Sequence, residues 1–441
     1  MKQLLSILCA ALLFAGCKKD NNVKVFEETP EERMSARIKE LNAALTGSEH
    51  GWKASLTTSA RGGGGYGFYL DFDESQSMLM VADLNDESAT KTNTSTFRIK
   101  WVMNATLIFD TYNYISMLQD PSPAIYGGAA GSGLQSDVEF EYQRINGDSI
   151  ILRGFKYKNN LILVKATAEQ KNRYLSAAFK ANIDEMTNFF AVKQNNYINV
   201  AGINNMVEFI LDKSTKTAKF QYMNDNGAVV QVIGKYSYED VGVIFAEGFV
   251  LNGITFVRAK IENGELVLYT ADGKKFVVKQ NNIPILPMKE LFAYNGTYRE
   301  LYIGSSLPAG VTSGFNAIYT ATAGKFVAMS PTRTLLDVRF ILTNSTTATV
   351  TMRNQSGTST FTGNATFKYT YSDGVITLSN PTYDNNWSSR VTQLVDLQNF
   401  FVNGGPFRVD YVQSSNPNVT NLGGLYRVSD NTSFFYGSFR K

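Results

Sequence analysis

The sequence contains very little cysteine, histidine and proline, and it has no excess of charge of either sign. Two cysteines, one histidine and 10 prolines occur among 441 residues, and 42 basic residues stand against 39 acidic ones. A lone histidine, His50, cannot build a histidine-rich zinc site. A net charge of +3 gives no electrostatic basis for nucleic-acid binding. No Gly-x-Ser-x-Gly nucleophile elbow is present either. We therefore expect a protein with no enzymatic activity, no cofactor and no nucleic-acid partner.

Aromatic residues and glycine are abundant. The chain has 23 tyrosines, 29 phenylalanines and 35 glycines. Aromatic side chains favour strands, and glycine favours the tight turns between them. The composition therefore predicts a mainly β protein of antiparallel, barrel-like or sandwich-like regions.

The N-terminus has the pattern of an exported, lipid-modified protein. Lys2 precedes an apolar run over residues 4–14 that is too short to cross a bilayer, and Ala15 and Gly16 then precede Cys17. This arrangement resembles the bacterial lipobox, which implies that Cys17 is acylated and anchors the protein in a membrane. The alternative is an ordinary secretory signal with an incidental cysteine. Since the other cysteine lies inside the signal, the mature fold has no disulfide.

The pattern divides the chain into five segments. They are a signal peptide (1–16), a tether (17–28), a first β domain with two helices (29–187), a second β domain (188–280) and a C-terminal β domain (281–441).

The first β domain begins with a helix. Thr29 and Glu32 form a capping box, Pro30 occupies the first helical position and Gly47 follows the last. Alternating apolar residues then predict about seven strands with short connections, which favour an up-and-down barrel or a strongly curved sheet. A second, linking helix is predicted after Thr167.

The C-terminal domain repeats the strand pattern. Asp373-Gly374 separates two alternating runs and predicts a two-residue hairpin. One short helix is predicted over residues 390–401, and the aromatic run over residues 433–439 is suited to a closing strand.

Acidic residues gather at two strand ends. Asp71 and Asp73 end one predicted strand, and Asp83 and Asp86 follow the next. Since Ca²⁺ takes six to eight oxygen ligands, these four residues are candidates for a calcium site. Acidic residues also favour exposed turns, which is the simpler interpretation.

A cluster of aromatic residues provides candidate ligand contacts. Tyr112 and Tyr114 lead into a Pro/Gly-rich loop that ends near Gly133, with Trp101 before it and Tyr126 inside it. Loops on a rigid scaffold often carry binding residues, and aromatic rings can stack on a sugar or a peptide. The alternative is that these rings fill β cores.

Several long motifs point to a family. They are GWKASL, GGGGYGFYLDFDE, TLIFDTYNYI and GSGLQSDVEFEY, which lie between Val25 and Gln280. Together they resemble Bacteroidetes lipoproteins classed as domain of unknown function 4302. The resemblance implies secretion, lipid anchoring, a mostly β fold and a supporting role in nutrient capture or import. It supplies no catalytic residues.

The sequence therefore predicts a lipoprotein of the outer membrane, on the cell surface or otherwise on the periplasmic face. We expect a non-enzymatic binding or accessory component of a nutrient-uptake system, with a glycan or peptide ligand and outer-membrane uptake proteins as partners. A structural or adhesive surface protein is the first alternative. A hydrolase such as a glycosidase is the second, because any two facing carboxylates could serve it.

Overall fold

The computed structural model describes residues 29–60 and 63–441, and the protein is mostly β. The predicted signal peptide and Cys17 lie outside the described residues. The chain divides into two compact units, one that ends at Lys180 and the other from Ala181 to Lys441. The boundary falls inside helix α7 (Ala177–Val192).

The first unit contains an eight-stranded closed barrel. Each strand pairs antiparallel with the next, and β8 pairs with β1, so that Trp52 stands opposite Lys165. The predicted barrel-like antiparallel sheet is confirmed. The strands are β1 (Trp52–Thr57), β2 (Gly65–Phe72), β3 (Ser77–Ala82), β4 (Asn93–Trp101), β5 (Ala105–Phe109), β6 (Glu139–Asn146), β7 (Ser149–Gly154) and β8 (Asn160–Lys165).

Side chains fill the interior of this barrel. In β2 the residues of one face, Tyr66, Phe68, Leu70 and Phe72, are all at most 4% exposed. They belong to one continuous core with inward residues from the other strands. An eight-stranded barrel is just wide enough for its own side chains, and this interior is a packed core.

Helix α2 (Pro30–Thr46) packs against one end of the barrel. It has the predicted capping box of Thr29 and Glu32. Leu41 and Leu45 are buried in the barrel core, and the indole N–H of Trp52 donates to the carbonyl of Leu45 over 2.9 Å. The helix therefore belongs to the barrel core.

The predicted linking helix forms as two helices. The capping box of Thr167 and Gln170 is present, but α6 (Ala168–Tyr174) ends before α7 begins. The Tyr174 ring stacks on Tyr69 with centroids 5.5 Å apart and contacts Phe179 at 4.8 Å. Helical structure after Thr167 is as predicted, and only the continuity of the helix differs.

The second unit begins with an open sheet. Nine strands run in the order β16-β15-β14-β13-β12-β11-β10-β9-β17. Phe220 stacks on Phe249 with centroids 4.3 Å apart, which places aromatic rings in its core. The strands are β9 (Asn196–Ile198), β10 (Val207–Asp212), β11 (Thr217–Met223), β12 (Val229–Tyr238), β13 (Val243–Leu251), β14 (Ile254–Glu262), β15 (Glu265–Thr270), β16 (Lys275–Val277) and β17 (Lys279–Gln280).

The C-terminal region is a second closed barrel. β18 pairs with both β19 and β25, so the final strand closes the sheet as predicted. Asp373 and Gly374 form the predicted two-residue turn, both with positive φ. The strands are β18 (Glu300–Ile303), β19 (Arg333–Leu342), β20 (Thr347–Ser356), β21 (Ser359–Ser372), β22 (Val375–Tyr383), β23 (Phe407–Val412), β24 (Leu422–Arg427) and β25 (Phe434–Arg440).

Helices contribute to the core of this barrel. The predicted helix is confirmed as α11 (Val391–Asn403), and α9 (Phe315–Met329) forms in a stretch that we expected to be β. Both helices place phenylalanines in the core, among them Phe315 and Phe401. Two shorter helices complete the region, α8 (Met288–Leu291) and α10 (Asn385–Ser388).

We predict that Leu41→Ala lowers the free energy of unfolding of the first unit by about 2–5 kcal/mol, the usual cost of a cavity at a fully buried leucine. Leu41 is 0% exposed. Urea denaturation followed by tryptophan fluorescence measures the change. Lys39→Ala, on the exposed side of the same helix, should change it by less than about 0.5 kcal/mol. Equal effects of the two substitutions would show that α2 is not part of the barrel core.

Candidate binding site

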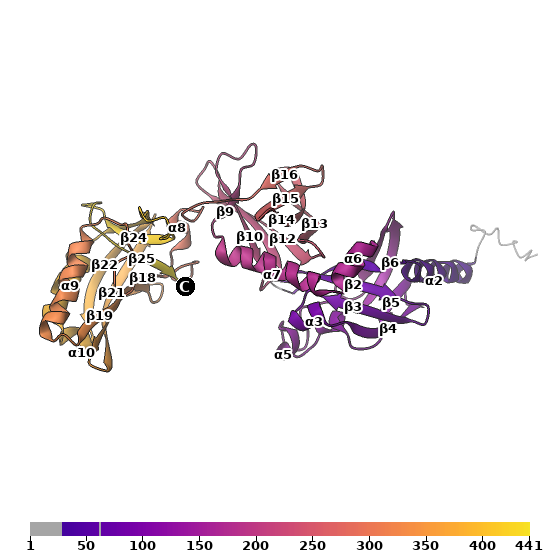
Figure 1. Ribbon diagram of the computed structural model, residues 1–441, viewed down its shortest axis with the longest axis horizontal. Helices are drawn as coiled ribbons and strands as arrows, with labels where there is room; N and C mark the ends of the chain where they lie inside the picture. The colour runs from indigo at the N-terminus through magenta and orange to yellow at the C-terminus, as the bar shows by residue number, and fades with distance from the viewer. Residues whose placement is uncertain (1–28, 61–62) are drawn as a thin grey trace, which may run out of the picture. The chain divides into compact units, whose positions relative to one another are not determined.

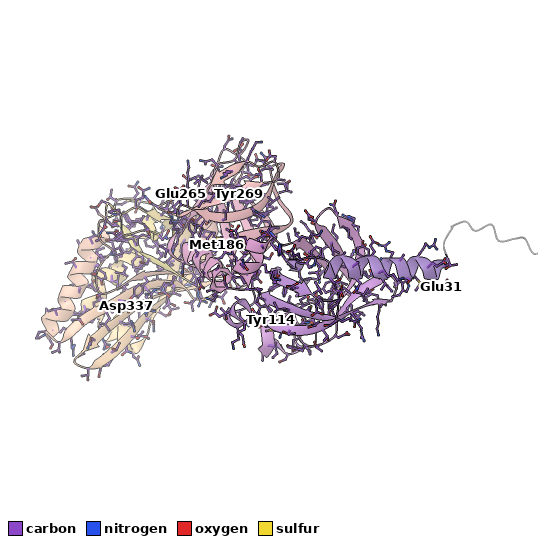
Figure 2. All side chains as sticks on the ribbon, turned by 45° about the vertical axis from the view of Figure 1, so that its right-hand side comes forward. Glu31, Tyr114, Met186, Glu265, Tyr269 and Asp337 are labelled. Atoms are coloured by element: carbon purple, nitrogen blue, oxygen red, sulfur yellow. The ribbon has the colours of Figure 1, made fainter. Side chains whose placement is uncertain are left out.

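A long connection covers one end of the first barrel. Residues 110–138, here called the capping loop, join β5 to β6 and contain the short helices α4 (Tyr114–Met117) and α5 (Pro123–Tyr126). Figure 1 shows α5 and α2 at opposite ends of the barrel, and in Figure 2 Tyr114 lies away from Glu31 at the start of α2. The two ends of the barrel are therefore covered by different segments.

A buried carboxylate attaches the capping loop to the β7–β8 turn. Asp137 is 3% exposed, and its Oδ1 accepts hydrogen bonds from the backbone N–H groups of Lys156 (2.7 Å) and Tyr157 (3.0 Å). The carboxylate lies directly over Gly154, where any Cβ would overlap it. Glycine at this position therefore gives Asp137 the space to reach the turn.

Asn159 ties the same loop to the β1–β2 connection. Its Nδ2 donates to the carbonyl of Gln135 (2.8 Å), and its Oδ1 accepts from the hydroxyl of Ser59 (2.6 Å). The backbone N–H of Ala60 also donates to the carbonyl of Leu134 (3.1 Å). Three connections at this end of the barrel are thus joined by hydrogen bonds.

Two of the predicted ligand-binding tyrosines hold the capping loop in place. The Tyr126 ring meets Tyr66 edge-on, with centroids 5.9 Å apart, and its hydroxyl donates to the carbonyl of Leu84 (2.9 Å). The Tyr114 hydroxyl donates to the carbonyl of Lys91 (3.1 Å). Both rings pack against the barrel core. Burial, together with the nearby Asp83 carboxylate, raises the pKa of Tyr126 above its usual value. Tyr114 and Tyr126 therefore attach the capping loop to the barrel.

Tyr112 is the predicted residue that faces solvent. It is 59% exposed, and its hydroxyl donates to Asp120 Oδ2 over 2.7 Å. Partial burial and this hydrogen bond raise the pKa of Tyr112 to about 12. A raised pKa favours the neutral phenol, so this contribution to stability is complete below pH 10 and is lost as the pH rises through about 12. Ile125, 47% exposed, lies on the same loop. The capping loop therefore presents the Tyr112 ring to solvent and restrains it by the hydrogen bond to Asp120.

Trp101 is not brought to this end of the barrel. It ends β4 and stands opposite Ala105, whereas Phe97 stands opposite Phe109, which leads into the capping loop. The exposed residues Val102 and Met103 follow Trp101 in the turn. The four predicted aromatic residues therefore do not form one site.

The four predicted calcium ligands are also separated. Asp71 and Asp73 lie near the β2–β3 turn, whereas Asp83 and Asp86 follow the far end of β3. Asp71 pairs with Lys171 at 2.8 Å. The carboxylate of Asp73 accepts hydrogen bonds within its own turn.

The second pair of aspartates has different surroundings. Asp83 is buried, and Asp86 pairs with Lys180 at 3.3 Å. Within residues 29–60 and 63–441, no group of three or more metal-ligating His, Cys, Asp or Glu side chains occurs. The four aspartates do not surround a single ion.

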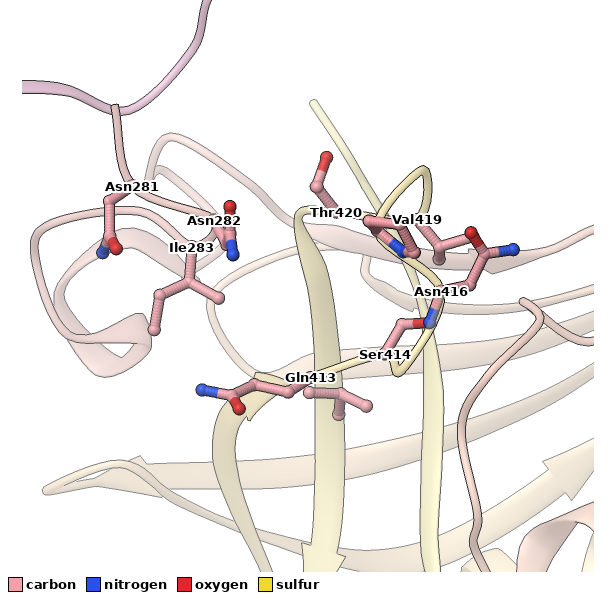
Figure 3. A pocket seen from close by; sticks show the side chains of 10 residues that line it. Asn281, Asn282, Ile283, Gln413, Ser414, Asn416, Val419 and Thr420 are labelled. Atoms are coloured by element: carbon pink, nitrogen blue, oxygen red, sulfur yellow. The ribbon is translucent and has the colours of Figure 1, made fainter. Parts of the chain in front are cut away.

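Hollows elsewhere in the described chain were not predicted from the sequence. A polar pocket of about 190 Å³ lies where residues 281–283 face a loop that carries Asn416 and Thr420 (Figure 3). It is smaller than the roughly 300–1,000 Å³ that is usual for small-molecule sites. A larger hollow of about 640 Å³ lies on strands β19–β22. The alternating threonines of these strands were its only sequence signal.

Comparison with known proteins gives one substantial match. The family model described as "Domain of unknown function (DUF4302)" matches residues 22–263. No curated protein sequence matches the chain. Among the described residues, no helix combines the length and the apolar character needed to cross a membrane.

Two solved structures show remote likeness. One is a protein of unknown function from the DUF3598 family of Nostoc punctiforme PCC 73102, at 8% identity and a TM-score of 0.15, over 74% of this chain and 96% of that one. The other is the vaccine antigen transferrin binding protein B of Haemophilus parasuis Hp5, a Tyr-167-Ala and Trp-176-Ala double mutant. It matches at 11% identity and a TM-score of 0.13, over 88% of this chain and 73% of that one. At such scores neither likeness carries an argument.

We predict that Asp137→Ala loosens the capping loop. Two hydrogen bonds to a charged acceptor are lost, each worth about 1.5–3 kcal/mol, so opening should become at least about tenfold more frequent. Chymotrypsin cleavage after Tyr126, followed by mass spectrometry, measures the opening. The matched control is Asp148→Ala in the β6–β7 turn, where the carboxylate is 81% exposed. Unchanged cleavage in Asp137→Ala would contradict the anchoring role.

Proposed function

This chain belongs to the DUF4302 family, and from that premise we propose that it is a lipid-anchored binding or accessory lipoprotein of a bacterial nutrient-uptake system, without enzymatic activity. In this proposal, Cys17 is the acylated residue, and the protein is anchored in the outer membrane on the cell surface. The resemblance of its motifs to Bacteroidetes lipoproteins supports this assignment.

The observation that carries the binding role is the way the capping loop holds Tyr112. A ring that is 59% exposed costs little to desolvate on one face, and its hydrogen bond to Asp120 limits its rotation. An aromatic side chain restrained before binding loses less conformational entropy when a ligand stacks on it. The contacts of Asp137 and Asn159 attach the other end of the same loop to the β7–β8 turn.

The packed barrel interior directs recognition to this outer surface. Inward residues from all eight strands fill the space, and the capping loop adds Ile115 and Leu118 to the same core. A ligand would therefore meet the outside of the capping loop. The ligand classes that suit an aromatic ring beside a carboxylate are a glycan and a peptide.

The anchoring claim is tested in cells. We predict that the natural chain incorporates an alkyne-labelled fatty acid and sediments with the outer membrane, because acyl chains on Cys17 hold it there. Cys17→Ala should abolish the label and release the protein from the membrane fraction. Cys9→Ala, inside the predicted signal peptide, is the control and should retain the label. A label that persists in Cys17→Ala would contradict the proposal.

The binding claim is tested by thermal shift with neutral oligosaccharides and short peptides. A ligand at a hundredfold its dissociation constant adds about 2.7 kcal/mol, and we predict that one class raises the unfolding temperature of the first unit by about 5–11 °C. Tyr112→Ala should remove the shift. Tyr294→Ala, at a tyrosine that is 40% exposed in the second unit, should retain it. A shift that survives Tyr112→Ala would exclude the capping loop as its site.

A further inference from the structure

The outer face of the C-terminal barrel carries an ordered row of side chains, most of which are threonines. Ile341, Thr349, Thr366 and Thr382 stand directly opposite one another across β19, β20, β21 and β22. All four line an open hollow of about 640 Å³, here called the threonine groove. Its volume lies within the range that is typical of small-molecule sites.

A second row lies beside the first and is fixed by side-chain hydrogen bonds. The Thr351 hydroxyl donates to Asn364 Oδ1 (2.8 Å), and Asn364 Nδ2 donates to Asp384 Oδ2 (2.9 Å). Asp384 also accepts from the backbone N–H groups of Asn364 (3.0 Å) and Trp387 (2.8 Å). The amide and the carboxylate therefore have defined orientations before any ligand arrives.

An irregularity in β22 shapes one side of the groove. The pairing of β21 with β22 shifts register after Thr366, and Asn380 on β22 has a φ of 50°. Pro381 follows and has no N–H to give to a ladder. Bulges of this kind redirect a strand and the side chains after it. The segment after the bulge places Tyr383 and Asp384 in the lining.

Tyr383 borders the groove, but its ring belongs to the core face of β22, because it stands opposite the buried Ala365 while Thr382 stands opposite Thr366. The Tyr383 ring packs on Trp387 with centroids 6.1 Å apart and planes 21° from parallel. Trp387 is 1% exposed and belongs to the barrel core, so the Tyr383 ring packs toward that core. Tyr383 itself is half-buried. This contact holds the end of β22 against the core, and it leaves recognition in the groove to the rows of polar side chains.

The charges of the lining exclude other ligand classes. Among the described residues, neither lysine nor arginine lines the groove, so an anion would meet only the Asp384 carboxylate. That carboxylate already accepts three N–H groups and is a poor ligand for a cation. The Thr351 hydroxyl donates to Asn364, and the Thr382 hydroxyl donates to the carbonyl of Thr366 (3.4 Å). The hydroxyls of Thr343 and Thr349 share a hydrogen bond (2.9 Å). Since a hydroxyl has two acceptor positions, the lining still offers acceptors for the hydroxyl donors of a neutral polyhydroxylated ligand.

The floor of the groove does not suit an added peptide strand. β19, β20 and β21 are each paired on both sides, so their backbone groups are already used. Strand addition needs an open sheet edge. Recognition at this floor must therefore come from side chains.

We propose that the threonine groove binds a neutral oligosaccharide, with the threonine and Asn364 side chains hydrogen-bonding its hydroxyl groups. This site goes beyond the proposed role of the capping loop, and it lies outside the residues 22–263 that the family model matches. The C-terminal barrel thereby has a recognition function of its own.

Isothermal titration of the purified protein with maltohexaose, cellohexaose, xylohexaose, mannohexaose and chitohexaose tests the proposal. At least one of these probes should bind, and Thr349→Val and Thr366→Val should each weaken its binding by tenfold or more. Thr366→Val removes one hydroxyl from the floor and keeps a strand-compatible shape, so thermal unfolding should be nearly unchanged.

Two controls separate this site from other surfaces. Thr370→Val changes an exposed threonine on the same strand that does not line the groove, and it should leave binding intact. Tyr112→Ala should also leave it intact, so failure of the capping-loop site and failure of the groove are distinguishable. Binding by none of the five probes, or binding that survives both groove substitutions, overturns the proposal.

Discussion

The pairing of β8 with β1 is the constraint on which the first unit depends. It removes both sheet edges and fixes the width of the barrel, so that inward side chains from eight strands fill the interior. Once the interior is full, the segments at the two ends become parts of the same core. Helix α2 contributes Leu41 and Leu45 at one end, and the capping loop contributes Ile115 and Leu118 at the other. Since the interior is full, we expect a ligand to contact the side chains that the capping loop presents to solvent.

The strand pattern of the fold could be predicted because local rules and tertiary packing agree there. Alternation placed Tyr66 and Phe68 on the same buried face, and Asp373-Gly374 adopted the two positive φ values that its turn requires. The capping boxes at Thr29 and Thr167 likewise depend only on residues three positions apart. Barrel closure is different, because pairing β1 with β8 joins residues more than a hundred positions apart.

The missed helix α9 shows where local rules fail. It begins after Gly314 without a side-chain cap, it contains Gly324, and its buried residues include Thr322. Glycine and β-branched residues both lower helix propensity. Its burial among the phenylalanines of the barrel core stabilises it instead, and that information is not local. The break between α6 and α7 has the same character, since Tyr174 is held by its contacts with Tyr69 and Phe179.

The site could be located only in part from the sequence. The Pro/Gly-rich loop was identified, but Tyr112 and Tyr114 lie two positions apart, and only the start of α4 at Tyr114 turns one outward and the other toward the barrel. Trp101 was placed with them by proximity in sequence, although a hairpin separates them by its full length. The threonine groove was missed for a related reason. Its rows are neighbours across four strands, and Thr366 and Thr382 are brought together by register rather than by spacing.

The capping loop is part of the folded core and not a lid over an accessible interior. Amide hydrogen exchange of the unliganded protein tests this most directly, because it measures local opening. The N–H groups of Lys156 and Tyr157, which donate to Asp137, should exchange about as slowly as those of the β1–β8 seam. Rapid exchange at these amides beside a slow seam would mean that the loop opens by itself, and would contradict the account.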